Sequence, residues 1–361
     1  MKLKRKLFRG MKISAASVLI LTAVVCVAKR LPEVYGGSDA VMAAAAFTLT
    51  DGKYMTQSGT EPTSVAATAP TASGAVQTNA KADSPKSRDK SGYYNSRGDH
   101  SGEAVYDVTE KTIGADGVAV GEGWLKNRAG LDVDFNAALN KPLTFQVQKN
   151  AKSPQVLIYH THTGEAYLDE DVDYFYESYY SRTNNNDFNV VAVGNAITEA
   201  LNKNGVNTLH DITVHDSTYN GSYDRSAQTV TDDLKKNPGI KVVLDIHRDA
   251  LGTEQNKVKT TFEYNGKKGA QIMILSGCDP DNERGFVNWK NNLSFALKLQ
   301  DTAEKLYPGM TRPISFDYFA YNEYICDGSL LIEIGTDANS IDEAEYAGKL
   351  LADVLAKVIL N

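Results

Sequence analysis

Hydrophobic residues gather in short uninterrupted runs from residue 155 onward, and such runs are typical of strands buried on both faces. The runs are residues 155–159, 241–246, 270–275 and 329–334. Between them, hydrophobic positions recur every three or four residues, which predicts amphipathic helices at 189–204, 291–307 and from 340 onward. The last helix opens with Ser340-Ile341-Asp342-Glu343, the pattern of a capping box. Alternating strands and helices predict an α/β fold with an open, mostly parallel, twisted sheet and helices on both faces.

The first hundred residues follow a different pattern. Residues 13–28 are an uncharged, mostly apolar run behind a basic segment, residues 1–12, which should stay in the cytoplasm. A span of the bilayer needs about 17–25 residues, so this run predicts a single-pass membrane anchor or the apolar part of a signal peptide. Residues 29–103 contain a stretch rich in Ser, Thr, Ala, Gly and Pro, which predicts a disordered extracytoplasmic linker. We therefore expect the folded domain to span residues 104–361.

The charge is distributed unevenly along the chain. The 361 residues sum to −7, but the first 30 carry eight Lys and Arg side chains and no acid, so the remainder sums to −15. Phosphate binding depends on Lys and Arg, so this acidic body argues against nucleic acid as a partner. Cys278 and Cys326 could form a disulfide after export, although two ordinary buried thiols are the simpler expectation.

Ionisable side chains lie at the carboxyl ends of three predicted strands, where ligands collect in open α/β sheets. His160 and His162 follow the first strand, His247 follows the second, and Glu333 lies within the last. Imidazole is a common metal ligand, and a catalytic zinc takes three protein ligands and one water. A buried carboxylate is costly in isolation, so Glu333 should meet a buried cation or act as an acid and base. The sequence therefore predicts a metal-dependent active site.

Several assignments stay open at this stage. If the strand continues past His160, then His160 and His162 face the same way, whereas a tight turn would leave one of them on the metal. Glu165 could be a further ligand or could cap the helix that comes after it. Arg248 could hold a substrate carboxylate or pair with Asp249.

Four segments resemble the stage II sporulation protein P family: VLIYHTHTGEAY at 156–167, SYDRS at 222–226, VVLDIHRDA at 242–250 and LLIEIGTDAN at 330–339. The resemblance covers roughly residues 104–361 and implies a zinc-dependent N-acetylmuramoyl-L-alanine amidase. It implies hydrolysis of peptidoglycan in forespore engulfment, with a possible second activity as an endopeptidase on peptide cross-links. It also implies two partners, stage II sporulation protein D, a lytic transglycosylase, and stage II sporulation protein M. The expected location is the mother-cell membrane, with the domain facing the forespore.

The motifs of the wider zinc amidase family imply roles for individual residues of this chain. By this resemblance His162 and His247 are Zn²⁺ ligands and Glu333 is the catalytic glutamate. The helix-borne Glu that is another ligand in that family has no counterpart near residues 185–187. The candidates for this third ligand, of which we favour the first, are His160, Glu165, Asp187 and His215. The candidates for substrate contact are Arg248 and Tyr167.

Two other functions fit part of the pattern. His-x-His after a strand also opens the metal-dependent amidohydrolase barrels, but these need eight strand–helix units and more downstream histidines than this chain has. A wall-binding scaffold without metal, which activates a partner hydrolase, would explain the missing glutamate. Zinc content distinguishes the scaffold from the enzyme.

Overall fold

The structure is a computed structural model that describes residues 99–360. The basic segment, the predicted anchor and nearly all of the predicted linker lie outside these residues. Within residues 99–360, none of the helices has the length and apolar character needed to cross a bilayer.

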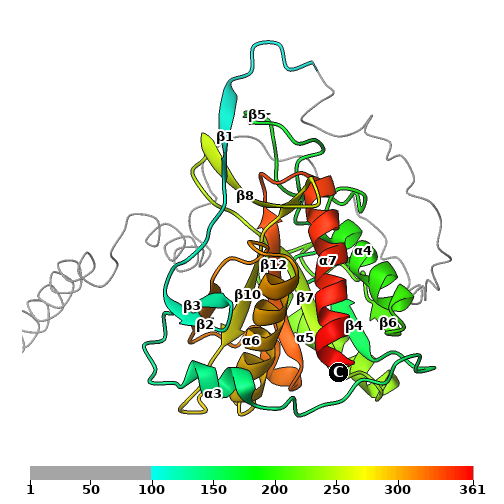
Figure 1. The fold of residues 1–361 in the computed structure, drawn as a ribbon. Coiled ribbons are helices and arrows are strands. Elements are labelled where there is room, and N and C mark those ends of the chain that lie inside the picture. Colours follow the sequence, from blue (N-terminus) through cyan, green and yellow to red (C-terminus); the bar gives the residue numbers. More distant parts are fainter. Residues whose placement is uncertain (1–98, 361) are drawn as a thin grey trace, which may run out of the picture. The chain divides into compact units, whose positions relative to one another are not determined.

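An eight-stranded sheet forms the centre of the fold (Figure 1). In spatial order its strands are β2 (Val118–Val120), β3 (Gly123–Asn127), β11 (Ile314–Asp317), β10 (Ile272–Gly277), β12 (Ser329–Thr336), β7 (Val242–Asp249), β4 (Val156–Tyr159) and β6 (Thr208–His210). The four strands β12, β7, β4 and β6 are parallel. All four predicted strands form, and they lie side by side at the centre of the sheet.

The main sheet is mixed, with five parallel and two antiparallel strand pairs, so the prediction of a mostly parallel sheet is confirmed only in part. β10, β11 and β3 run parallel to one another, but β10 runs antiparallel to β12. The reason lies in the connection between β7 and β10, which is a pair of strands, β8 (Asn256–Tyr264) and β9 (Lys267–Ala270), rather than a crossover helix. The chain therefore enters β10 at the same end of the sheet at which β7 finishes, and β10 runs in the opposite direction to β7.

A second sheet has four strands, in the order β5-β1-β8-β9. Its two further members are β1 (Val105–Lys111) and β5 (Tyr174–Tyr176), and β1 pairs with both β5 and β8. These strands escaped prediction because each of them buries a single hydrophobic residue. In β1, for example, Val108 is the one buried residue of seven.

Helices cover both faces of the main sheet, as predicted. Side chains of β4 alternate between two clusters: Val156 and Ile158 join the large core, whereas Leu157 and Tyr159 pack with Val230. The large core contains residues of α4 (Val190–Lys203), α6 (Trp289–Leu306) and α7 (Ile341–Ile359). The opposite cluster lies beneath α5 (Ser222–Lys236) and the short helix η1 (Glu323–Ile325). A short helix, α3 (Phe135–Asn140), packs on α6.

The predicted capping box at the start of α7 is confirmed. The Glu343 N–H donates to Ser340 Oγ at 3.2 Å, and the Ser340 N–H donates to Glu343 Oε2 at 3.0 Å. Loss of an N-cap side chain typically costs about 1 kcal/mol. We expect Ser340→Ala to lower the free energy of unfolding by about 1 kcal/mol in urea denaturation, while the exposed Ser217→Ala leaves it unchanged. Equal unfolding midpoints for the two variants would contradict a stabilising role of this cap.

Candidate functional site

Three parallel strands, β12, β7 and β4, bring the candidate residues together at their carboxyl ends. Glu333 of β12 lies directly beside His247 of β7 in the register, so both side chains point to the α5 face. After β4 the chain turns sharply at residues 161–164 and carries His162 and Glu165 to the end of β7. The predicted convergence of ionisable groups from separate strands is therefore present.

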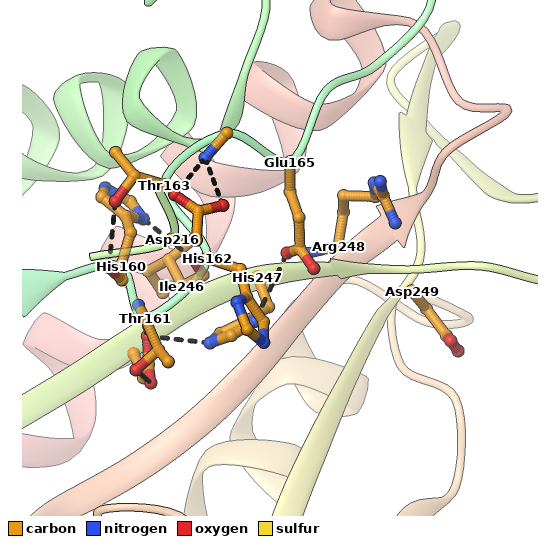
Figure 2. A network of polar contacts seen from close by, with 12 residues as sticks. His160, Thr161, His162, Thr163, Glu165, Asp216, Ile246, His247, Arg248 and Asp249 are labelled. Atoms are coloured by element: carbon orange, nitrogen blue, oxygen red, sulfur yellow. Dashed lines mark hydrogen bonds and ion pairs between the residues drawn. The ribbon is translucent and has the colours of Figure 1, made fainter. Parts of the chain in front are cut away.

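His162, Glu165 and His247 form a buried cluster. Glu165 Oε2 lies 3.3 Å from His247 Nδ1, and Figure 2 shows Glu165 reaching toward His247. The rings of His162 and His247 are nearly perpendicular, with centroids 5.4 Å apart. Two ligands on a tetrahedral zinc lie about 3.3 Å from each other, because each bond is about 2.0–2.1 Å long. The spacing of Glu165 and His247 therefore suits a shared metal ion.

Two carboxylates flank His247 on opposite ring nitrogens. Asp245 Oδ1 lies 2.9 Å from Nε2, close enough for an ion pair but without the alignment of a hydrogen bond. Burial opposes a positive charge on His247, but Asp245 and Glu165 outweigh it and hold the pKa of His247 well above its usual value. Burial also disfavours the Glu165 carboxylate, yet the charge of His247 and its hydrogen bond hold the pKa of Glu165 below its usual range. The two carboxylates therefore favour a positive charge at the buried position between them. A divalent cation would also supply such a charge.

Asp245 is itself held firmly in place. Its Oδ1 accepts a hydrogen bond from the Thr161 N–H at 2.8 Å, and its Oδ2 accepts one from Thr161 Oγ1 at 2.6 Å. Carboxylates that contact the far nitrogen of a ligating histidine typically orient the ring. Asp245 therefore lies where it can orient the His247 ring.

Glu333 carries a carboxyl group in an unusual environment. Glu333 is half-buried as a residue, but its Oε2 atom is fully buried and has no hydrogen-bond partner. Burial and the nearby Asp249 raise the pKa of Glu333 to about 8. A carboxyl group with a pKa near neutrality can accept and return a proton under working conditions.

The donor set fits zinc in chemistry, although the side chains do not yet stand in ligand geometry. Within residues 99–360, no group of three His, Cys, Asp or Glu side chains is arranged to hold a metal ion. Two imidazoles and one carboxylate are nevertheless an established zinc ligand set. Burial lowers the pKa of His162 to about 4, so its ring is neutral and able to donate a lone pair at neutral pH. His162 instead stacks on Tyr219 and lies 3.4 Å from Ser222 Oγ, so closure around a metal requires its ring to move.

The other candidates for the third ligand lie elsewhere. His160 is held by the Ile246 carbonyl at 2.8 Å on Nδ1 and by His210 Nε2 at 2.8 Å on Nε2. His215 is similarly engaged, through the His160 carbonyl at 2.8 Å and Thr229 Oγ1 at 2.9 Å. Asp187 is exposed on the loop before α4. Among these candidates, Glu165 is the one that contacts His247. The turn after β4 separates His160 from His162, so the two rings do not face the same way. The geometry therefore does not support the preference for His160 that the sequence suggested.

Arg248 and Tyr167 have internal contacts rather than a position facing the cluster. The Arg248 side chain donates to the carbonyls of Ala166 at 3.1 Å and Ser181 at 2.6 Å, and its N–H donates to Glu165 Oε2 at 3.1 Å. Asp249 pairs with Arg312 at 2.6 Å instead of Arg248, and Figure 2 shows Arg248 and Asp249 directed away from His247. The Tyr167 hydroxyl is buried and donates to the Ile334 carbonyl at 2.9 Å. Neither predicted substrate contact is thus supported by the geometry.

Cys278 and Cys326 are free thiols, as the simpler expectation had it. Sequence reasoning missed several aromatic and basic residues around the cluster. They include Tyr219 and Tyr223, whose rings lie near the two histidines, Tyr321, whose ring contacts that of Tyr223, and Arg182, which pairs with Asp216 at 2.6 Å. The one available signal was the SYDRS segment, which contains Tyr223 but has no chemistry that marks it as a site.

The family described as Stage II sporulation protein P (SpoIIP) matches residues 45–356. The chain belongs to this family. The resemblance drawn from the four sequence segments is therefore confirmed. Among curated proteins, the chain is 29% identical over 220 residues to Stage II sporulation protein P of Bacillus subtilis (strain 168). That match covers 56% of this chain and 50% of the relative, so the chain spans about half the length of the curated relative it matches.

Solved structures of amidases show a weak likeness to this member of the family. The N-acetylmuramoyl-L-alanine amidase from Clostridium difficile 630 is 16% identical, with a TM-score of 0.33 over 58% of this chain and 96% of that chain. The CwlD amidase from Clostridioides difficile, solved in complex with the GerS lipoprotein, is 14% identical, with a TM-score of 0.32 over 57% of this chain and 96% of that chain. Scores of this size do not establish a shared fold.

Proposed function

We propose that this family member is a zinc-dependent peptidoglycan hydrolase that cleaves the amide bond between N-acetylmuramic acid and L-alanine. The observation that carries the proposal is the convergence of His162, Glu165, His247 and Glu333 at the ends of three parallel strands. Membership of a stage II sporulation family supports a role for this hydrolysis in spore formation.

The ligands of the zinc would be His162, Glu165 and His247. When bound, the ion would polarise the scissile carbonyl and lower the pKa of a water molecule at its open position. Asp245 would keep the His247 ring in place, and the Arg248 N–H would hold Glu165 Oε2 at 3.1 Å. Two of the three ligands, His247 on β7 and Glu165 in the loop after β4, would thereby be held in place, and the His162 ring would move to join them.

Glu333 would carry the proton. Its carboxylate would take a proton from the attacking water and return it to the amine nitrogen of L-alanine as the C–N bond breaks. The products would be a lactyl carboxylate on the sugar and a peptide with a new amino terminus. General acid–base catalysis of this kind contributes roughly 10²–10⁴-fold to the rate.

The finer parts of the proposal concern location, partners and a second activity. An anchor at residues 13–28 would hold the domain, residues 104–361, outside the mother-cell membrane, where it faces the forespore in engulfment. Stage II sporulation protein D would act on the glycan strands of the same peptidoglycan, and stage II sporulation protein M would be a further partner. An endopeptidase activity on cross-links would use the same site.

A non-catalytic scaffold that activates a partner hydrolase is the second candidate function. It is favoured by the finding that no three metal-binding side chains in the described part of the chain stand in ligand geometry. Glu165, however, contacts His247 and would supply the carboxylate that a helix-borne glutamate provides in the wider zinc amidase family. We therefore favour the enzyme.

Zinc content and product chemistry test the proposal directly. We expect the purified full-length protein to bind about one zinc and to release peptides with new L-alanine amino termini from purified peptidoglycan. His247→Ala should lose both, because it removes a proposed ligand and leaves Glu165 and Asp245 uncompensated, whereas His100→Ala, outside the cluster, should keep both. Absence of zinc and of release in the wild-type protein, with zinc supplied, would instead favour the scaffold. New termini other than L-alanine would indicate endopeptidase activity.

A further inference from the structure

A buried series of hydrogen bonds leads to His247 from the loop between β11 and β12. Its members, which we call the Asp245 network, are Asn322, Ser226, Thr161 and Asp245. Asn322 Nδ2 lies 2.9 Å from Ser226 Oγ. Ser226 Oγ lies 2.7 Å from Thr161 Oγ1, which lies 2.6 Å from Asp245 Oδ2. The network reaches His247 where Asp245 Oδ1 lies 2.9 Å from its Nε2, so it connects α5 and the loop before η1 with a proposed zinc ligand.

Every member of the Asp245 network lies inside the protein. Thr161 and Ser226 are fully buried, and Asn322, the most exposed member, is 4% exposed. Polar side chains in a core cost free energy unless they are hydrogen-bonded, whereas apolar side chains would fill the same space without that requirement. Buried networks whose bonds are all made hold their members in one arrangement. The network is therefore suited to fixing the position of its last member, Asp245.

The hydrogen bonds of the network run in one direction. A carboxylate accepts and cannot donate, so the single Thr161 hydroxyl proton points to Asp245. Thr161 Oγ1 then accepts on its other side, which makes Ser226 the donor to Thr161, and Asn322 Nδ2 donates to Ser226 Oγ in turn. The Tyr223 carbonyl, 3.1 Å from Ser226 Oγ and 3.2 Å from Asn322 Nδ2, is a longer alternative acceptor for both. The Ser226 hydroxyl therefore fixes which way the Thr161 hydroxyl faces.

The groups that border the network are uncharged. Burial raises the pKa of Tyr159 and of Glu323 well above their usual values, and the Asp245 carboxylate adds to both effects. Tyr159 approaches Asn322 as well as Asp245, and the Gly277 N–H donates to Glu323 Oε2 at 3.0 Å. Both side chains are therefore neutral at pH 7, and the charge that the network holds in place is that of Asp245.

The orientation of the His247 ring depends on where Asp245 is held. Glu165 and Asp245 face opposite ring nitrogens of His247, and Figure 2 shows Thr161 on the side away from Glu165. Thr161 holds both Asp245 oxygens, through its N–H at 2.8 Å and its hydroxyl at 2.6 Å. A shift of the Thr161 hydroxyl therefore moves the carboxylate that faces Nε2, and with it the direction of Nδ1, the nitrogen beside Glu165. Replacing such partners of a metal-binding histidine typically changes metal affinity by roughly 10–100-fold.

We propose that Ser226 is a positioning residue for His247 and acts through Thr161 and Asp245. This inference rests on the proposed function for the identity of the metal ion that His247 would bind. It gives a role to the segment SYDRS, whose last residue is Ser226 and which the proposed reaction does not otherwise use. The Ser226 hydroxyl fixes the Thr161 hydroxyl, which in turn fixes the Asp245 carboxylate. The carboxylate sets the angle of the His247 ring.

Zinc affinity tests this role, because a residue that only stabilises the fold would leave the affinity of the folded protein unchanged. The dissociation constant for zinc is measured on the full-length protein by competition with a coloured chelator. We expect Ser226→Ala to raise this constant by about tenfold and Thr161→Val to raise it by roughly 10–100-fold. Thr161→Ser, which keeps the hydroxyl group, should bind zinc as the wild-type protein does.

Ser294→Ala is the matched control for Ser226→Ala. Ser294 on α6 is also a buried serine, and its Oγ donates to the Ala138 carbonyl at 2.6 Å, outside the Asp245 network. Both substitutions remove a buried hydrogen bond and should lower the unfolding temperature, but Ser294→Ala should leave the zinc affinity unchanged. Equal losses of zinc affinity in the two variants would overturn the role of Ser226.

A double variant tests the route through Thr161. If Ser226 acts through the Thr161 hydroxyl, then Ser226→Ala should weaken zinc binding by less than about twofold in a protein that already carries Thr161→Val. A further loss of about tenfold in the double variant would show that the two residues act independently, and it would overturn the proposal.

The side-chain ¹⁵N signals of His247 give a readout that needs no zinc. In the chelator-treated protein with ¹⁵N-labelled histidine, we expect Ser226→Ala to shift the Nε2 signal of His247 and Ser294→Ala to leave it in place. If the wild-type protein binds no zinc but this shift is observed, the proposed function fails and the positioning role stands. If the wild-type protein binds zinc and Ser226→Ala changes neither the affinity nor the His247 signal, the positioning role fails and the proposed function stands.

Discussion

Glu333→Gln is expected to lower the rate of peptide release from peptidoglycan by roughly 10²–10⁴-fold while the protein keeps about one zinc per chain. Gln has nearly the same shape as Glu but cannot accept a proton from water or return one to the leaving amine. Zinc should stay because Glu333 is not one of the three proposed ligands. Folding should not suffer either, since Glu333 Oε2 is buried without a hydrogen-bond partner and its charge is disfavoured there. The measurements are initial rates of L-alanine amino-terminus formation, zinc content and unfolding temperature.

Asp233→Asn is the matched control for this variant. Asp233 on α5 also has a buried oxygen without a hydrogen-bond partner, and burial together with the nearby Asp211 raises its pKa to about 6. It lies outside the cluster, so its replacement should leave peptide release unchanged. Full activity of Glu333→Gln would remove Glu333 from the mechanism, and loss of zinc in that variant would make it a ligand instead.

Glu165→Gln is expected to abolish stable zinc binding and peptide release together. The neutral amide is a poor zinc ligand, and the change also removes a carboxylate that lies 3.3 Å from His247 Nδ1. We expect the zinc content to fall from about one to below about 0.1 per chain after dialysis against a weak chelator. Zinc content by atomic spectroscopy and peptide release are measured on the same samples.

His160→Gln distinguishes the two assignments of the third ligand. His160 is buried and bonded to the Ile246 carbonyl and His210, so its replacement should lower the unfolding temperature but leave zinc in the folded protein. Asp187→Asn, at an exposed position, should change neither. Loss of zinc from folded His160→Gln, with zinc retained in Glu165→Gln, would restore the assignment made from sequence.

Residues at strand ends were the part of the site that could be predicted. His247 and Glu333 were identified because each follows or interrupts a continuous apolar run, and the register confirms that they lie side by side. Their neighbour Glu165 could not be assigned in the same way. It lies in a turn, where residue spacing does not reveal which side chain faces the sheet, and the alternation that made His160 attractive ends at Thr161.

Helix α5 was not predicted from the sequence, and the residues that it buries are mostly polar. The buried residues of α5 are Ser222, Ser226, Val230 and Asp233, of which Val230 alone is apolar. Yet α5 covers the face on which His247 lies, and Tyr223 at its start contacts both site histidines.

The sequence by itself determined the α/β class, the four central strands, the three amphipathic helices, the family, and His162, His247 and Glu333 as candidates. These features depend on local patterns, in which burial of apolar side chains imposes a period of two or 3.6 on the chain. The tertiary structure decided the antiparallel direction of β10, the place of Glu165 beside His247 and the stacking of Tyr219 on His162. Each of these depends on contacts between residues far apart in the chain. A turn or a strand pair sets the direction of the next element, and that direction cannot be predicted from the local pattern of apolar and polar residues.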